Sequence, residues 1–122
     1  MKILVVDDSE ADIDDLVKQL NNLGYSDIIP AAGGREALAR LEENPEIGLI
    51  ILDRYMPEVD GFEVVKKLRH GTRSTRIAIA IMTSEVNEDE KMRLLMDYDV
   101  DYYIRKPVKA PALVRLFSTL AE

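Results

Sequence analysis

Polar side chains follow four of the short apolar runs in this chain, at the point where each run ends. They are Asp7 and Asp8 after residues 2–6, Asp53 after residues 49–52, Thr83 after residues 77–82, and Lys106 shortly after residues 102–104. Carboxylates without histidine or cysteine beside them suit Mg²⁺, which commonly shares its coordination shell with phosphate. A carboxylate can also act as a nucleophile toward phosphorus. With a lysine and a hydroxyl nearby, this set of side chains could accept a phosphoryl group.

The apolar run before Asp53 is the clearest single element. Residues 49–52 are consecutive large apolar side chains, a pattern typical of a strand buried on both faces. Pro57 disfavours regular structure just beyond the run, and Asp60 is predicted to be the N-cap of a helix. Asp53 therefore lies where a strand gives way to a loop, which is where ligands bind in open α/β sheets.

Strand and helix patterns alternate along the rest of the chain. Strands are predicted over residues 2–6, 28–32, 49–53, 77–82 and 102–104. Helices are predicted from the Ser9 cap to a C-cap at Gly24, around Ala37 and Leu41 up to Pro45, from Asp60 to near Gly71, from about Val86 to Met96, and around Leu113 to Leu120. We expect the fourth helix to pack through Met92, Leu95 and Met96. Alternation of this kind predicts one α/β domain, a doubly wound parallel sheet with helices on both faces.

The acidic residues should crowd together in such a sheet, because the carboxyl ends of parallel strands meet at one edge. Two carboxylates about 5 Å apart repel each other by roughly 3 kcal/mol at an effective dielectric constant of about 20. Asp7, Asp8 and Asp53 would therefore need a counter-ion, and Mg²⁺ fits an all-oxygen site. Lys106 would add a mobile positive charge, and Thr83 a hydroxyl donor.

Composition excludes several other classes of protein. The chain has 122 residues, enough for one core, and no cysteine, which rules out disulfides and thiolate metal sites. Its apolar runs are too short to span a bilayer and no signal peptide opens it, so we expect a cytoplasmic protein that does not bind membranes. The net charge of −7 and the scattered basic residues argue against direct nucleic-acid binding.

The residues at the strand ends resemble the motifs of response-regulator receiver domains, the regulatory modules of two-component signalling. The matching residues are Val5-Val6-Asp7-Asp8-Ser9, Leu52-Asp53-Arg54-Tyr55-Met56-Pro57 with Asp60-Gly61, Thr83-Ser84 and Lys106-Pro107. The resemblance covers residues 1–122 and implies a flavodoxin-like sheet with strand order 2-1-3-4-5. In that order the second strand, which supplies no polar end residue, is outermost.

The resemblance assigns the acidic residues to a phosphoryl site. It implies that Asp53 attacks phosphorus and becomes the phosphorylated residue. It also implies that Asp8 and Asp53 bind Mg²⁺ directly, that Asp7 acts mainly through water, and that the backbone carbonyl of Tyr55 completes the protein ligands.

The resemblance assigns the remaining residues to phosphate binding and to switching. Lys106 and Thr83 would hold the phosphoryl oxygens. Tyr103 occupies an aromatic switch position and would turn inward when Thr83 is drawn toward the phosphoryl group. The peptide bond between Lys106 and Pro107 would be cis.

The implied partners are a sensor histidine kinase or a histidine-phosphotransfer protein, and a downstream effector protein or domain. The surface formed by the fourth helix, the fifth strand and the fifth helix would change shape on phosphorylation. Two features depart from the family. Asp99-Val100 replaces a common Gly-Ala, and Tyr102 replaces an acidic residue that often helps a dimer interface, so a homodimer stays an open alternative.

Three functions compete for this pattern: a phosphorylation-gated switch, a binding module that no longer needs phosphorylation, and a Mg²⁺-dependent phosphatase. Taken singly, each residue has a plainer explanation, since Thr83 could cap a helix and Lys106 could be an ordinary surface lysine. Their joint placement at four strand ends favours the switch, which turns over no outside substrate and is in that sense not an enzyme. Tyr55 stands where a phosphatase would need a second acid, and His70 is not expected to donate a phosphoryl group.

Overall fold

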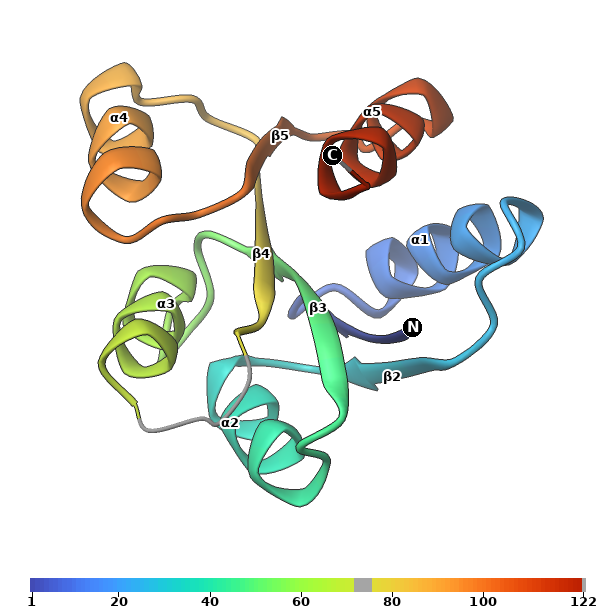
Figure 1. Ribbon diagram of the computed structural model, residues 1–122, viewed down its shortest axis with the longest axis horizontal. Helices are drawn as coiled ribbons and strands as arrows, with labels where there is room; N and C mark the ends of the chain where they lie inside the picture. The colour runs from blue at the N-terminus through green and yellow to red at the C-terminus, as the bar shows by residue number, and fades with distance from the viewer. Residues whose placement is uncertain (72–75, 122) are drawn as a thin grey trace.

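The computed structural model describes residues 1–71 and 76–121, in which strands and helices alternate (Figure 1). The strands are β1 (Lys2–Val6), β2 (Ile28–Ala31), β3 (Ile47–Asp53), β4 (Ala78–Thr83) and β5 (Tyr102–Arg105). The helices are α1 (Glu10–Asn22), α2 (Gly34–Glu43), α3 (Gly61–His70), α4 (Glu88–Asp97) and α5 (Ala110–Leu120). All strand pairs are parallel and their order is β2-β1-β3-β4-β5, which confirms the predicted flavodoxin-like sheet.

Strand β3 lies in the middle of the sheet and sends alternate side chains to opposite faces. Ile50 and Leu52 pack in the core under α2, α3 and α4, whereas Leu49 and Ile51 pack in the core under α1 and α5. Figure 1 shows these two groups of helices on either side of the strands. Because both faces are covered, the strand is apolar throughout until it ends at Asp53.

Side-chain caps begin three of the helices. The Ser9 hydroxyl accepts a hydrogen bond from the Asp12 backbone N–H before α1, and the Asp60 carboxylate accepts one from Glu63 N–H before α3. Both caps were predicted. In the same way Asn87 caps α4, so that helix begins at Glu88, two residues later than predicted.

The predicted packing of α4 is wrong in one respect. Leu94 is its fully buried residue, Leu95 is partly buried, and Met92 and Met96 are exposed to solvent. The sequence offered several apolar side chains on a very polar helix, and the stripe that faces the sheet is narrower than the spacing suggested. Two methionines therefore lie on the outer side of α4.

Smaller differences concern element ends. The C-cap of α1 is Leu23, and Gly24 follows it in the left-handed region with φ +97°, a conformation that favours glycine. Strand β2 ends at Ala31 and includes Pro30. Proline lacks the backbone N–H, and an edge strand tolerates this because it has a neighbouring strand on one side only. Thr83 is the last residue of β4 and does not follow it.

Asp99 explains the first departure from the family pattern. Its φ of 54° lies in the left-handed region, which glycine adopts without steric cost. Aspartate is among the other residues that tolerate this region best. Its carboxylate pairs with Arg76 at 2.9 Å, and its carbonyl accepts hydrogen bonds from Arg69 and Arg76. The carbonyl contacts would also be available to a glycine, so what the aspartate adds is the ion pair between its carboxylate and Arg76.

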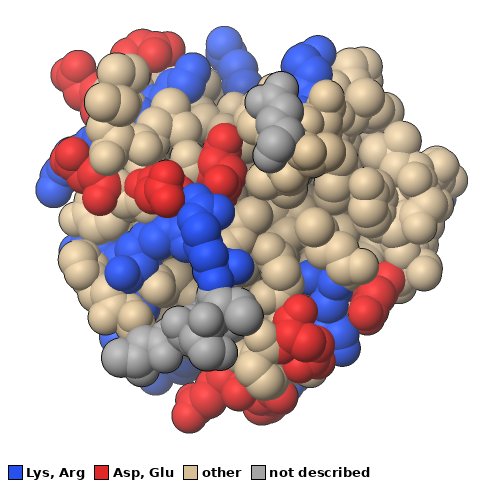
Figure 2. All heavy atoms as spheres, in the orientation of Figure 1, with Lys and Arg blue, Asp and Glu red and all other residues tan. Residues whose placement is uncertain are grey.

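Two surface properties bear on the expected partners. On the face drawn in Figure 2, positive and negative side chains lie side by side over α3 and α4 and are not separated into areas of one sign. Among the residues that the structure describes, no helix is long and apolar enough to cross a bilayer.

Candidate functional site

The ends of β1 and β3 bring the predicted acidic residues together. Carboxylate oxygens of Asp7, Asp8 and Asp53 all lie within 4.8 Å of one another, an arrangement that could hold a metal ion. Asp7 and Asp53 are buried, the latter with 6% of its surface exposed, while Asp8 faces solvent. The Ser9 backbone N–H donates to Asp7 Oδ1 at 3.0 Å, which fixes that carboxylate. An all-carboxylate group with one open side fits the oxygen-rich, partly hydrated shell of Mg²⁺.

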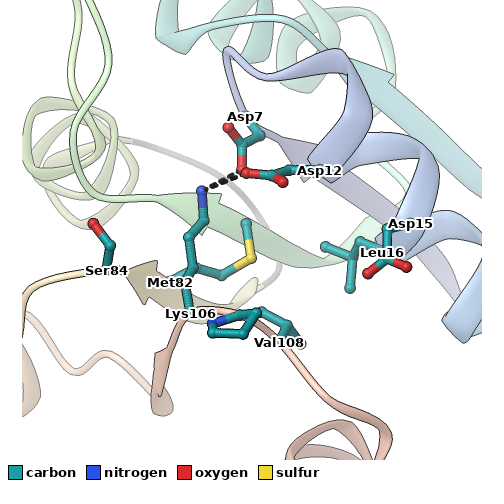
Figure 3. A pocket seen from close by; sticks show the side chains of 9 residues that line it. Asp7, Asp12, Asp15, Leu16, Met82, Ser84, Lys106 and Val108 are labelled. Atoms are coloured by element: carbon teal, nitrogen blue, oxygen red, sulfur yellow. Dashed lines mark hydrogen bonds and ion pairs between the residues drawn. The ribbon is translucent and has the colours of Figure 1, made fainter.

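Lys106 reaches this cluster from the end of β5. Its Nζ lies 2.6 Å from Asp7 Oδ2 and 3.3 Å from Asp12 Oδ2 (Figure 3). The same Nζ lies 3.4 Å from Asp53 Oδ1. Its backbone N–H donates to the Thr83 carbonyl at 2.7 Å, and the bond to Pro107 is cis, as expected from the resemblance. The hydrogen bond to Thr83 holds the lysine backbone in place, and the ammonium group contacts three carboxylates.

The close packing of charges shifts two pKa values. Burial raises the pKa of Asp53 to about 6, and the negative charge of Asp7 adds to this, although the Lys106 ammonium acts in the opposite direction. Burial alone would lower the pKa of Lys106, but its hydrogen bond to Asp7 and the charge of Asp53 outweigh that effect, so its pKa is raised. Lys106 therefore stays charged at neutral pH, and Asp53 holds its proton to a higher pH than a solvent-exposed aspartate does.

Thr83 lies at the same sheet edge, where its hydroxyl bonds to the nearby backbone of Glu85. The side chain is fully buried, and its hydroxyl donates to the Glu85 carbonyl at 2.9 Å and accepts from the Glu85 N–H at 3.3 Å. To contact a group on Asp53 the hydroxyl would have to leave this local turn. The structure therefore brings the acids and Lys106 together and leaves Thr83 beside them.

Gly61 is required by the backbone of the site. A Cβ atom at this position would lie 2.3 Å from the carbonyl oxygen of Asp53, far inside contact distance. The Gly61 N–H also donates to the Arg54 carbonyl at 3.0 Å. The glycine thus lets the start of α3 lie directly against the strand end that carries Asp53, a reason the sequence motif alone did not reveal.

The two tyrosines of the predicted site differ in exposure. Tyr55 has 50% of its surface exposed, and the Arg54 guanidinium lies 4.5 Å from the centre of its ring. Tyr103 packs against the core, and burial raises the pKa of its hydroxyl. That hydroxyl is buried near the Asn87 backbone without a hydrogen bond of normal geometry. The ring of Tyr103 is therefore already turned inward here.

Arg54 is a residue of this region that sequence reasoning missed. Its guanidinium forms a two-point contact with the Glu90 carboxylate on α4, through Nε and, at 3.0 Å, through Nη2. Its Nη1 lies 3.1 Å from Asp60 Oδ2 at the start of α3. No local pattern could have paired residues 36 positions apart. The residue after Asp53 thus ties the starts of two helices to the end of β3.

Replacing Arg54 with alanine should destabilise the fold by about 2 kcal/mol, because it leaves the poorly exposed Glu90 carboxylate without its counter-charge. Urea unfolding of the purified chain measures this. Arg35→Ala is a matched control, since it removes an ion pair to Glu58 that is exposed on both sides and should cost no more than about 0.5 kcal/mol. Equal effects of the two substitutions would show that the Arg54 contact carries no special weight.

Fold and site together define a flavodoxin-like α/β protein with three clustered carboxylates and a contacting lysine at the carboxyl edge of its sheet. The chain matches the family model of the response regulator receiver domain over residues 3–118. It is 38% identical over 107 residues to the chemotaxis protein CheY1 of Helicobacter pylori, covering 88% of this chain and 86% of that protein.

Two further relatives agree with this. The chain is 40% identical over 107 residues to PhoP of Bacillus subtilis, an alkaline phosphatase synthesis transcriptional regulatory protein, covering 87% of this chain and 42% of that protein. The solved structure of the chemotaxis protein CheY4 from Vibrio cholerae superposes with a TM-score of 0.84 at 30% identity, covering 96% of this chain and 95% of that one. The chain belongs to the response regulator receiver domain family of two-component systems.

Proposed function

We propose that residues 1–122 act as one receiver domain, a signalling switch that accepts a phosphoryl group on Asp53. The observation that carries the proposal is the meeting of three carboxylates within 4.8 Å with a lysine that contacts two of them. Such a group has an excess of negative charge that a bound Mg²⁺ would offset, and the metal together with Lys106 would then attract a phosphoryl group.

The chemistry begins with a phosphohistidine on a donor protein, a sensor histidine kinase or a histidine-phosphotransfer protein. An oxygen of Asp53 forms a bond to phosphorus while the bond from phosphorus to the histidine nitrogen breaks, and that nitrogen takes a proton from solvent. Lys106 would hold the phosphoryl oxygens as charge develops on them. Asp7, Asp8, Asp53 and the Tyr55 backbone carbonyl would hold Mg²⁺, which would offset the negative charge of the phosphoryl group.

Thr83 and Tyr103 would then report the new state. The Thr83 hydroxyl would exchange its contact with Glu85 for one with a phosphoryl oxygen, which changes the loop that leads to α4. Tyr103 lies against the same loop, so its packing would change with it. Phosphorylation would thereby shift the balance between two arrangements of the α4–β5–α5 surface, which a downstream effector would distinguish.

Incubation of the chain with acetyl phosphate and Mg²⁺, followed by mass spectrometry of the intact protein, tests the proposal. The switch predicts one equivalent of added phosphoryl group, stable in acid and labile in base, and none when Mg²⁺ is chelated. The absence of any gain would favour the phosphorylation-independent binding module. Release of many equivalents of phosphate per chain would favour a phosphatase.

Tyr55 is expected to protect the acyl phosphate from water. Its ring is held beside the site by the Arg54 guanidinium, so replacing Tyr55 with asparagine should admit water and shorten the lifetime of phosphorylated Asp53 by about fivefold, about 1 kcal/mol of barrier. The decay of the base-labile mass gain measures this lifetime. Tyr55→Phe keeps the ring and should leave the lifetime unchanged. An asparagine variant that decays at the same rate or more slowly would contradict the prediction.

A further inference from the structure

Asp12 is a carboxylate at the site that neither the metal-binding group nor the phosphoryl chemistry uses. It lies in the first turn of α1, where its backbone N–H is bonded to the Ser9 cap. Its side chain reaches across to Lys106, with Oδ2 3.3 Å from Nζ. Asp12 is thus a third acid in contact with the ammonium group that the proposed function assigns to the phosphoryl oxygens.

The position of Asp12 places its charge at the opening of a cavity beside Lys106. A cavity of about 300 Å³ opens beside Lys106, between α1 and the loop from β5 to α5 (Figure 3). Asp12 and Asp15 line it together with Lys106, and the Asp12 side chain is 56% exposed. The negative charge of Asp12 therefore lies where the cavity meets solvent, next to the ammonium group that the proposed function assigns to the phosphoryl oxygens.

Two consequences follow for a small anionic phosphodonor. The Asp12 carboxylate competes with the donor's oxygens for the hydrogen-bonding capacity of Lys106, and its charge repels the donor during approach. The repulsion grows with the donor's charge, so a dianion is disfavoured more than a monoanion. Asp7 and Asp53 also contact Lys106, but they belong to the acidic group that binding of a cation would neutralise.

We propose that Asp12 is a specificity-determining residue that selects against small anionic phosphodonors. The inference rests on the proposed function, because it concerns the donor that phosphorylates Asp53. Asp12 contacts Lys106 and not the reacting atoms. It therefore affects the donor through the lysine and through the electrostatic repulsion of its own charge.

The test compares phosphorylation rates of the intact chain with two donors in the presence of Mg²⁺: acetyl phosphate, a dianion at neutral pH, and phosphoramidate, which carries less charge. Asp12→Asn should raise the rate with acetyl phosphate about tenfold and the rate with phosphoramidate about threefold, as expected for loss of a unit charge about 8 Å away in a medium of dielectric constant about 60. Added salt should reduce both gains. Asp14→Asn removes the same charge from an exposed position on α1 outside the cavity, and should change both rates by less than about twofold.

Equal gains with the two donors, no gain at all, or the same gain from Asp14→Asn would overturn the proposal. A wild-type chain that gains no phosphoryl group with either donor would instead overturn the proposed function. Binding of inorganic phosphate in the presence of Mg²⁺, followed through the backbone amide resonances of Thr83 and Lys106, then tests Asp12 without phosphoryl transfer. About tenfold tighter binding by Asp12→Asn supports its role, and unchanged binding refutes it.

Discussion

Replacing Lys106 with alanine is expected to slow phosphorylation of Asp53 by at least about a hundredfold while making Mg²⁺ bind more tightly. The slower transfer follows from the loss of a preorganised cation at the phosphoryl oxygens, where removal of one such group typically costs two to three orders of magnitude. The tighter binding follows because the ammonium group contacts Asp7 and Asp53 directly and repels any cation that approaches them. Removal of that repulsion should lower the Mg²⁺ dissociation constant about fivefold or more.

These opposite effects distinguish a role in transfer from a role in folding. The transfer rate is measured with acetyl phosphate, and Mg²⁺ affinity by calorimetry or by chemical shifts of the Asp7 and Asp8 amides. Lys109→Ala removes an exposed lysine at the N-cap of α5 and should change neither quantity appreciably. A Lys106→Ala chain that transfers at the wild-type rate, or one that binds Mg²⁺ more weakly, would contradict the assignment.

Replacing Asp53 with asparagine should stabilise the metal-free protein by about 2 to 3 kcal/mol at pH 7, even though it removes the phosphorylated residue. Burial and the charge of Asp7 raise the pKa of Asp53 from 3.8 to about 6 in the folded state. A raised carboxyl pKa means that the folded chain binds more protons than the unfolded chain between those values. The contribution of Asp53 to the free energy of unfolding is therefore fully present below about pH 4, where the carboxyl group is protonated. This contribution is lost as the pH rises through 6 and the buried group becomes charged.

Urea unfolding with a chelator present, at pH 4, 5, 6 and 7, tests this sign. The difference in unfolding free energy between Asp53→Asn and the wild type should grow over that interval and then level off, since the variant has no carboxylate to desolvate. Asp8→Asn is the control, because Asp8 belongs to the same acidic group but faces solvent. A difference that stays constant with pH, or one that shrinks, would show that burial does not penalise the Asp53 charge.

The sheet and the meeting of acids could be predicted because both follow from local patterns with few alternatives. Apolar runs such as residues 49–52 require burial on two faces. Parallel strands bring their carboxyl ends to one edge of the sheet, whatever the length or conformation of the loops. Asp7, Asp8, Asp53 and Lys106 therefore converge as expected, and the caps at Ser9 and Asp60 are where local side-chain chemistry puts them. The strand order itself needed the resemblance to a known family.

What could not be predicted depends on contacts between distant residues or on a choice among similar side chains. Glu90 and Arg54 meet only because α4 packs beside the loop after β3, and Asp12 reaches Lys106 only because α1 lies beside the end of β5. On α4 the burial of Leu94 in place of Met92 is decided by the helix's rotation about its axis, which a mostly polar sequence hardly constrains. Thr83 lies at the predicted sheet edge, and the contact of its hydroxyl with Glu85 depends on one local turn that no sequence pattern indicates.

Locating the modified residue tests the central claim most directly. After incubation with acetyl phosphate and Mg²⁺, borohydride reduces an acyl phosphate to an alcohol, which converts the phosphorylated aspartate to homoserine, and peptide mass spectrometry identifies its position. We expect homoserine at position 53 alone, and none when Mg²⁺ is chelated. Homoserine at position 7, 8 or 60, or an unmodified Asp53 in a chain that keeps its fold, would contradict the account.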